Sequence, residues 1–343
     1  GHVYPGIVIA EELKKNGWDV FFVGKKSDII VASGYEFYYL SATGFTRKVS
    51  LKTVVFFVRL LRSIIQSLAI LAKEKPSLVV GFGGYVSFPV IFAAWIKKIP
   101  SIIHEQNITA GIANKLSAKF ANKVCVGFEE AKKCFLSTKV VFTGNPIRKE
   151  ILSISKTPLT DHLPFTILIF GGSQGAHNLN VAIVNSLGQL SEIKEKIRFI
   201  HLTGANDFDV VQDAYRKNDF SADVYRYLFN IENAYMKASL VICRAGALTI
   251  TEIAAVKIPA ILVPYPFSTE GHQLTNAKYL SETGCAILLR ETELDKLSGK
   301  ILEIVSQPYI LRKMSDSYSK IFYHNSTKKF IEVINSIPSI KNL

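Results

Sequence analysis

The chain is organised around the segment Val241-Ile-Cys-Arg-Ala-Gly-Ala-Leu-Thr-Ile-Thr-Glu-Ile253. Its apolar start predicts a strand, the small residues around Gly246 predict a tight turn, and the rest predicts a helix. The first N–H groups of a helix lack partners within it and lie at the positive end of its dipole, so they attract anions. Glu252, six residues after Gly246, could accept hydrogen bonds from sugar hydroxyls. The segment fits a nucleotide diphosphate site, and it fits an ordinary strand-turn-helix equally well.

Composition sets the class of protein. A chain of 343 residues with 48% hydrophobic and 20% charged residues is globular and long enough for two domains, which excludes a disordered chain. The net charge of +13 is uneven, because residues 1–150 hold 21 Lys and Arg against 10 Asp and Glu. This basic half indicates an anionic partner such as phospholipid, pyrophosphate or nucleic acid. The four cysteines show neither metal-ligand spacing nor a disulfide framework, which is typical of reduced cytoplasmic thiols.

Strand and helix patterns alternate along both halves of the chain, which predicts two α/β domains with mostly parallel sheets. We expect strands over residues 19–23, 77–81, 100–104, 123–126 and 139–142, and then over 165–170, 198–202, 240–243, 260–264 and 286–289, with a short strand and loop over 225–230. Residues 151–164 read as a linker. In such a sheet a central first strand should precede the helix expected over 7–16, and we expect this strand to be missing from the given sequence. A longer chain that carries it should be more stable.

Residues 49–73 predict a long helix with one narrow polar stripe and a wide apolar face. We favour packing of this helix against a sheet, and contact with an anionic membrane surface is the alternative. No uninterrupted run of 18 apolar residues marks a helix that spans a membrane, and nothing resembles a signal peptide.

Several shorter motifs could carry chemistry. Gly171-Gly-Ser-Gln-Gly175 follows a strand and offers N–H groups and the Ser173 hydroxyl to a phosphate, but it lacks the ending of a P-loop and the spacing of a nucleophile elbow. His2 could accept a proton near neutral pH, or it could cap a helix. Arg148 could reach a pyrophosphate. Gln273 and Asn276 share a helix face and could bind sugar hydroxyls. The pattern predicts no metal site.

Seven motifs, in order, carry a family resemblance. They are Gly1-His-Val-Tyr-Pro-Gly6, Gly81-Phe-Gly-Gly-Tyr-Val-Ser87, His104-Glu-Gln-Asn107, Gly144-Asn-Pro-Ile-Arg148, Gly171-Gly-Ser-Gln-Gly-Ala176, Cys243-Arg-Ala-Gly-Ala-Leu-Thr-Ile-Thr-Glu-Ile253, and Gln273 with Asn276. Together they resemble the MurG family, peptidoglycan N-acetylglucosaminyltransferases that convert lipid I to lipid II. The resemblance covers nearly the whole chain. Ala245 and His272 depart from it, since the family commonly has Ser and Gln there.

The resemblance implies an α/β GT-B fold, with two Rossmann-like domains whose parallel sheets face a cleft. Residues 1–148 would form an N-terminal domain that binds the acceptor and the membrane. Residues 149–324 would form a C-terminal domain that binds UDP-GlcNAc, and residues 325–343 would form a helix that returns to the first domain.

The resemblance also implies roles for individual residues. His2 would be the catalytic base. The donor UDP-GlcNAc would be contacted by Gly1, Asn107, Arg148, Ser173, Leu228, Ala247, Leu248, Thr249, Ile250, Thr251, Glu252 and Gln273, with Glu252 on the ribose and Gln273 on the GlcNAc. The acceptor would be contacted by Gly83, Gly84, Tyr85 and Glu105.

By the same resemblance, the enzyme would transfer GlcNAc to the C4 hydroxyl of the MurNAc of lipid I with inversion, without a metal or cofactor. Its partners would be UDP-GlcNAc, lipid I, an anionic membrane surface and other wall-synthesis proteins, and not nucleic acid. It would lie peripherally on the cytoplasmic face of the bacterial plasma (inner) membrane. The alternatives are a UDP-GlcNAc 2-epimerase-like enzyme of the same fold and a non-enzymatic basic membrane-binding module. A dinucleotide-dependent oxidoreductase is less favoured, because no Gly-x-Gly-x-x-Gly is followed by an acid at the required distance.

Overall fold

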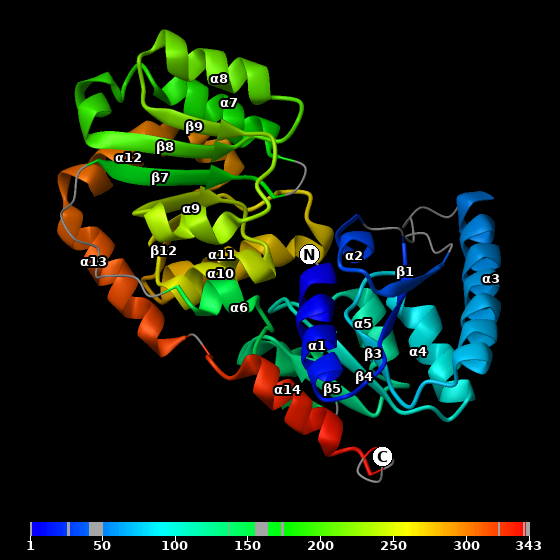
Figure 1. The fold of residues 1–343 in the computed structure, drawn as a ribbon. Helices are drawn as coiled ribbons and strands as arrows, with labels where there is room; N and C mark the ends of the chain where they lie inside the picture. Colours follow the sequence, from blue (N-terminus) through cyan, green and yellow to red (C-terminus); the bar gives the residue numbers. More distant parts are fainter. Residues whose placement is uncertain are drawn as a thin grey trace. The chain divides into compact units, whose positions relative to one another are not determined.

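The chain divides into two compact units, each built around a parallel sheet (Figure 1). Unit 1 comprises Gly1–Arg148 and Asn325–Leu343, and unit 2 comprises Lys149–His324. The computed structural model describes residues 2–25, 28–40, 51–136, 138–154, 164–172, 175–321, 323–338 and 340. The alternation of strands and helices confirms the expected pair of Rossmann-like α/β domains.

Unit 1 is organised around a four-stranded parallel sheet. The strands β3 (Val79–Gly81), β4 (Ser101–Glu105), β5 (Lys123–Val126) and β6 (Val140–Phe142) follow one another in the order of the sequence. A separate parallel pair is formed by β1 (Phe21–Gly24) and β2 (Glu36–Tyr39), of which the second was not expected from the sequence.

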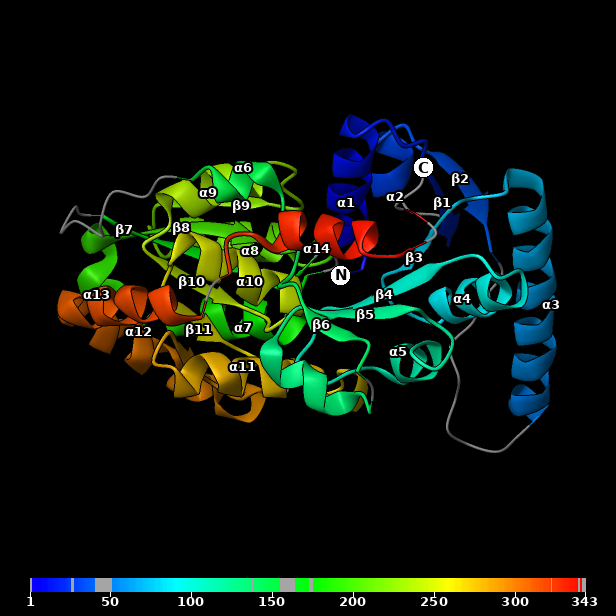
Figure 2. The same ribbon diagram turned by 90° about the horizontal axis from the view of Figure 1, so that it is seen from below.

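Helices cover both faces of this sheet. α1 (Val3–Lys15) and α14 (Ser326–Asn335) lie side by side on one face (Figures 1 and 2), where Ile9 and Phe330 pack with Ile102 of the sheet. On the other face, α4 (Ser87–Ile96) buries Ile91 against β3 and β4, next to α3 (Leu51–Glu74) and α5 (Ile112–Ser117). α2 (Asp28–Ala32) and the 3-10 turn η1 (Glu129–Cys134) complete the elements.

The first helix begins earlier than its apolar pattern predicts. We expected a helix from residue 7, but α1 begins at Val3 and includes Pro5 and Gly6. Proline is tolerated in a first turn because its missing N–H would have no partner there. His2 is consequently the residue at which the helix starts.

Helix α3 departs from the favoured expectation. Its inner side is buried at Ser63, Ser67 and Leu71, whereas Phe57 and Leu61 are 59% and 60% exposed. Over Val55–Glu74 it is long and apolar enough to cross a membrane by length and composition, and only 17% of its apolar window is buried. The sequence shows no uninterrupted apolar run here because Arg59 and Arg62 interrupt the apolar residues. Packing within the protein therefore accounts for only a narrow strip of this helix.

Unit 2 contains a six-stranded parallel sheet in the order β12-β11-β10-β7-β8-β9. Its strands are β7 (Phe165–Phe170), β8 (Ile197–Leu202), β9 (Ala222–Tyr225), β10 (Leu240–Cys243), β11 (Ala260–Leu262) and β12 (Ala286–Leu288). Ile167, Phe199 and Ile242 are fully buried at its centre, and each such side chain contributes roughly 1.5–3 kcal/mol by leaving water.

The remaining elements of unit 2 are helical connections. They are α6 (Lys149–Leu152), α7 (His177–Ser186), η2 (Ser191–Lys196), α8 (Phe208–Lys217), α9 (Ile231–Lys237), α10 (Ala247–Val256), η3 (Thr269–Gly271), α11 (His272–Glu282), η4 (Glu291–Lys296), α12 (Leu297–Ser306), α13 (Pro308–Ser317) and η5 (Tyr318–Lys320). The strand order reverses between β7 and β10, and this reversal positions the candidate site.

Candidate functional site

Two turns start side by side in unit 2 where the strand order reverses. The last residues of β7 and β10, Phe170 and Cys243, are partners in the sheet. The chain continues from them into the glycine-rich turn 171–175 and into the turn 244–246 that precedes α10. Open parallel sheets bind ligands beyond the carboxyl ends of their strands at such a reversal.

The N-terminus of α10 offers N–H groups to an anion. Gly246 ends the turn with extended backbone and Ala247 is the first helical residue. The first N–H used within the helix is that of Ile250, which donates to the Gly246 carbonyl at 2.9 Å. The N–H groups of residues 247–249 therefore have no acceptor within the helix and lie where its dipole favours negative charge. No acidic residue in the first turn opposes an anion.

Not every side chain predicted along α10 is available to a ligand. Ile250 is fully buried, and the Thr251 hydroxyl donates to the Ala247 carbonyl at 2.8 Å. These two side chains pack in the core and along the helix, so a contact of Ile250 or Thr251 with the donor stays a prediction. The Glu252 carboxylate is half-buried, and its Oε2 accepts a hydrogen bond from the Tyr235 hydroxyl of α9 at 3.1 Å. Tyr235 thus orients Glu252, a role that no sequence pattern indicated.

Buried polar groups hold the turn before α10. Asn276 is fully buried and its Nδ2 donates to the Ala245 carbonyl at 3.1 Å, so it holds this turn, and its contact with sugar hydroxyls stays a prediction. The Arg244 guanidinium donates to the Val263 carbonyl at 3.2 Å and to Glu291 Oε1 at 2.9 Å. This ion pair is almost entirely buried, so removing either partner would leave a charge in a poorly hydrated place.

Gln273 is the second residue of α11 and lies beside the loop that follows β11. Its Oε1 accepts a hydrogen bond from the Tyr265 N–H at 2.9 Å, which directs the side chain and leaves its Nε2 group as the donor for a ligand. Its neighbour His272, a departure from the family, uses Nδ1 to donate to the Thr269 carbonyl at 2.5 Å. His272 therefore stabilises the turn η3.

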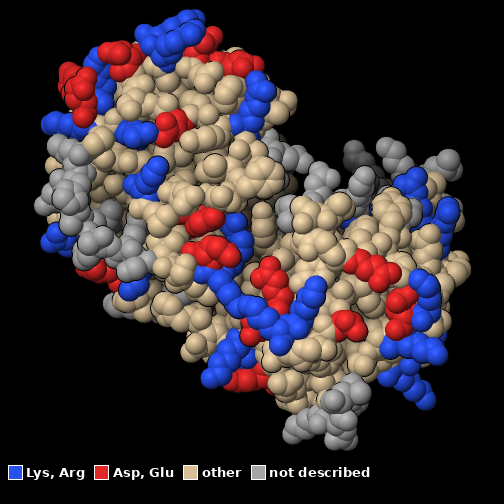
Figure 3. Space-filling model, in the orientation of Figure 1, with Lys and Arg blue, Asp and Glu red and all other residues tan. Residues whose placement is uncertain are grey.

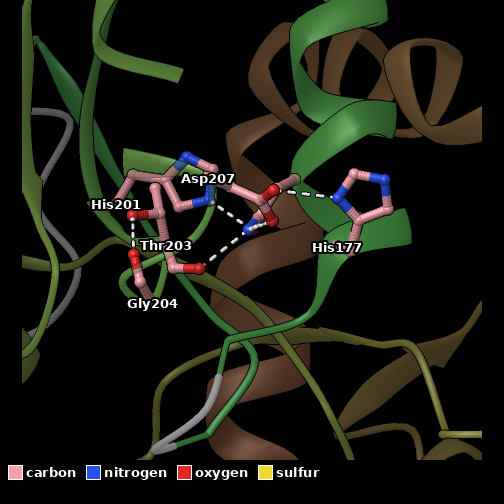
Figure 4. Close-up of polar contacts among 6 residues, drawn as sticks. His177, His201, Thr203, Gly204 and Asp207 are labelled. Atoms are coloured by element: carbon pink, nitrogen blue, oxygen red, sulfur yellow. Dashed lines mark hydrogen bonds and ion pairs between the residues drawn. The ribbon is translucent and has the colours of Figure 1, made fainter. Parts of the chain in front are cut away.

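A buried polar network supports the glycine-rich turn (Figure 4). Asn180 donates to the Thr203 carbonyl at 2.9 Å and to Asp207 at 2.7 Å, and its Oδ1 lies 3.0 Å from His201 Nε2. A side chain at Gly175, whose φ is +79°, would place Cβ 2.2 Å from the Thr203 carbonyl oxygen. Only glycine therefore fits where this turn meets β8.

The predicted donor contacts Gly1 and Ser173 lie outside the described residues. Leu228 is half-buried in the loop between β9 and α9.

In unit 1, His2 lies against a turn that requires glycine. Gly83 and Gly84 have φ angles of +90° and +74°, which side chains rarely adopt. A Cβ built on Gly83 would lie 3.5 Å from His2 Cε1, and one on Gly84 would lie 3.7 Å from His2 Cδ2. The structure thus brings together three residues predicted around the acceptor. His2 itself is exposed, and its Nδ1 lies 2.8 Å from Gln106 Oε1.

Glu105 is buried in unit 1, where its carboxylate accepts several hydrogen bonds. Its carboxylate is 2% exposed and accepts hydrogen bonds from the backbone and side chain of Asn107 at 2.9 and 3.1 Å. It also accepts from the Gly111 N–H at 3.1 Å and from Asn114 Nδ2 at 2.8 Å. Four donors satisfy this buried carboxylate, so Glu105 fixes the loop around Asn107, and its direct contact with the acceptor stays a prediction.

Two further predicted residues lie near the start of α1 or the glycine turn. The Arg148 guanidinium lies over the Tyr4 ring, with Cζ 4.8 Å from the ring centroid. This cation–π contact fixes the Arg148 side chain beside the first turn of α1. Tyr85 follows the glycine turn and is 44% exposed. Across the described residues, no group of three or more His, Cys, Asp or Glu side chains is placed to hold a metal ion.

Unit 2 therefore offers an anion site followed by a fixed carboxylate, and unit 1 offers an exposed imidazole on a glycine turn. The family model "Glycosyltransferase family 28 N-terminal domain" matches residues 1–126, and "Glycosyltransferase family 28 C-terminal domain" matches residues 166–332.

Individual proteins agree with this match. The chain is 36% identical to the UDP-N-acetylglucosamine–N-acetylmuramyl-(pentapeptide) pyrophosphoryl-undecaprenol N-acetylglucosamine transferase of Myxococcus xanthus, over 97% of this chain and 89% of the relative. It is 37% identical to the protein of that name from Thermodesulfovibrio yellowstonii, over 98% of this chain and 96% of the relative.

Solved structures share the GT-B fold. The crystal structure of Acinetobacter baumannii MurG superposes with a TM-score of 0.78 at 26% identity, covering 98% of this chain and 96% of that chain. A UDP-GlcNAc 2-epimerase from Neisseria meningitidis has a TM-score of 0.63 at 16% identity, covering 97% and 96%, which shows the fold alone. On the matches along almost its whole length, this chain belongs to glycosyltransferase family 28 and, within it, to the MurG family.

Proposed function

We propose that this chain transfers GlcNAc from UDP-GlcNAc to the C4 hydroxyl of the MurNAc of lipid I, giving lipid II for peptidoglycan synthesis. The observation that carries the proposal is identity above 30% along nearly the whole chain to transferases whose names state this donor and this acceptor. The anion site at α10, followed by the oriented Glu252, supports it from the geometry.

Unit 2 supplies most of the donor contacts in this proposal. The N–H groups of residues 247–249 bind the diphosphate, and Glu252 accepts hydrogen bonds from the ribose hydroxyls. The Nε2 group of Gln273 donates to the GlcNAc. By the family resemblance, the backbone of Leu228 contacts uracil. Gly1, Asn107, Arg148 and Ser173 are further donor contacts on the same ground.

The proposed reaction is a direct displacement. His2 accepts the proton of the C4 hydroxyl while the hydroxyl oxygen forms a bond to the anomeric carbon of GlcNAc. The bond from that carbon to the diphosphate oxygen breaks, and UDP leaves with the electron pair, so the configuration inverts to a β-1,4 link. The negative charge that develops on UDP is stabilised by the N-terminus of α10 and by Arg148. As in the family it resembles, we expect no metal requirement.

The acceptor groups of the proposal lie in unit 1. The pyrophosphate of lipid I approaches the backbone of Gly83 and Gly84, where absent side chains leave room, and exposed Tyr85 borders that turn. Glu105 contributes indirectly by fixing Asn107.

The same proposal places the enzyme peripherally on the cytoplasmic face of the plasma membrane, where a lipid-linked acceptor is found. Phe57, Leu61 and Ile65 of α3 are each about 60% exposed, which leaves a row of large apolar side chains in water. Lys and Arg side chains lie along the same side of unit 1 (Figure 3), where they can meet anionic headgroups. The family resemblance also implies that other wall-synthesis proteins are partners of the enzyme.

The test is acceptor-dependent release of UDP. Purified protein should release UDP from UDP-GlcNAc when a lipid I analogue is present and should release little without it. Omitting the MurNAc sugar from the analogue is the matched control. UDP release at the same rate without acceptor would overturn the transfer, and conversion of UDP-GlcNAc to its 2-epimer would establish the epimerase alternative.

A further inference from the structure

We propose that Gln106 is a positioning residue that fixes the tautomer of His2, so that Nδ1 carries the hydrogen and Nε2 is the basic nitrogen. The inference rests on the proposed function for the role of His2, but the tautomer itself follows from contacts within unit 1. A chain of hydrogen bonds runs from the Gly144 carbonyl through His104 and Gln106 to His2, and each member has only one consistent assignment.

The chain starts at a buried histidine. His104 has no exposed surface, and its Nε2 lies 3.1 Å from the Gly144 carbonyl oxygen. A carbonyl oxygen only accepts hydrogen bonds, so Nε2 must carry the hydrogen and Nδ1 must present a lone pair. Burial lowers the pKa of His104 from 6.5 to about 4, outweighing the opposing effect of the Gly144 carbonyl, and the ring is therefore neutral near pH 7.

Gln106 is the next member, and its amide has one possible orientation. Its side-chain Nε2 lies 3.0 Å from the Phe82 carbonyl and 3.1 Å from both the carbonyl and the Nδ1 of His104. All three are acceptors, so an oxygen in that place would meet three lone pairs. The residue is 1% exposed, and its own carbonyl accepts from Asn145 Nδ2 at 3.0 Å, which fixes the backbone as well.

The oxygen of Gln106 is consequently directed at His2. Gln106 Oε1 lies 2.8 Å from His2 Nδ1, so Nδ1 donates and the neutral ring keeps its lone pair on Nε2. The imidazole lies beside the turn, where a Cβ built on Gly83 would be 3.5 Å from His2 Cε1 and one built on Gly84 would be 3.7 Å from His2 Cδ2. In water a neutral histidine prefers hydrogen on Nε2, so the amide selects the less common form. That form has its basic nitrogen free of hydrogen before the acceptor hydroxyl arrives.

Nitrogen NMR of His2 tests the tautomer without any activity. In the full-length protein near neutral pH, we expect Nδ1 to show the shift of a hydrogen-bearing nitrogen and Nε2 that of a bare one. In Gln106→Met, which keeps side-chain length but removes the acceptor, the population should move toward hydrogen on Nε2. Hydrogen on Nε2 in the unaltered protein would overturn the inference, even if Gln106→Met fails to fold.

Kinetics test the consequence. With a lipid I analogue, Gln106→Met should lower kcat by about 10-fold to 100-fold, a part of the roughly 10²-fold to 10⁴-fold that general base catalysis contributes, while KM for UDP-GlcNAc changes by less than about twofold. Gln189→Met is the matched control, because it removes a glutamine oxygen that accepts from Ser298 in unit 2, and its kcat should be unchanged. Unchanged kcat in Gln106→Met would contradict the positioning role. An unaltered protein that transfers no GlcNAc would refute the proposed function while the NMR result still decides the tautomer.

Discussion

At the scale of single residues, the candidate site combines side chains that a ligand can reach with side chains that hold the surrounding turns in place. Glu252 and His2 are where a ligand could meet them, but Ile250 and Asn276 are buried. A sequence motif contains both the residues that contact a ligand and the residues that support them from the interior. Glu105 and Asn276 serve by holding Asn107 and the Ala245 turn, and only the folded chain separates this role from direct contact.

Glu252→Ala should weaken UDP-GlcNAc binding by about tenfold or more, because hydrogen bonds to a charged group contribute about 1.5–3 kcal/mol. Binding of the lipid I analogue should change little. Glu282→Ala on the exposed side of α11 is the control for loss of a carboxylate from the same unit. Calorimetric titration with each substrate measures both effects, and equal losses for donor and acceptor would remove Glu252 from the ribose.

At the scale of elements, strands buried on both faces were predicted well, because their apolar runs are continuous. β5, β7 and β10 have the predicted bounds. β2 was missed, since it has four residues, polar Glu36 at its start and one partner strand. α3 was assigned correctly as a helix, but most of its apolar window is not buried, because an apolar face in a sequence does not show what covers it.

Replacing Phe57 and Leu61 together by Asp should reduce binding of the protein to vesicles of anionic phospholipid by about tenfold or more, since two large side chains no longer enter the apolar layer. Val210→Asp, at a 68% exposed position of α8 in unit 2, controls for added charge on an exposed valine. Sedimentation with vesicles measures the bound fraction. If the Phe57/Leu61 variant sediments like the unaltered protein, α3 is not the membrane contact.

At the scale of the whole molecule, two buried histidines predict a dependence of stability on pH. Burial lowers the pKa of His104 to about 4 and that of His201 to about 3, against 6.5 in the unfolded chain. Between pH 6.5 and 4 the unfolded chain binds more protons, so stability falls on acidification by up to about 3 kcal/mol for each histidine.

Urea unfolding at several pH values between 4 and 7 measures this dependence. The pH slope for unit 2 should be shallower in His201→Gln than in the unaltered protein, whatever the absolute stability of the variant. His324→Gln, at an exposed position, should leave the slope unchanged. A stability that is flat across this range would show that the two rings do not stay neutral in the fold.

NMR of the purified product shows which bond the enzyme makes. After incubation with UDP-GlcNAc and a lipid I analogue, we expect a disaccharide in which GlcNAc is joined through a β anomeric carbon to the C4 oxygen of MurNAc. An α link, attachment to another hydroxyl, or recovery of the acceptor unchanged beside an epimerised sugar nucleotide would contradict it.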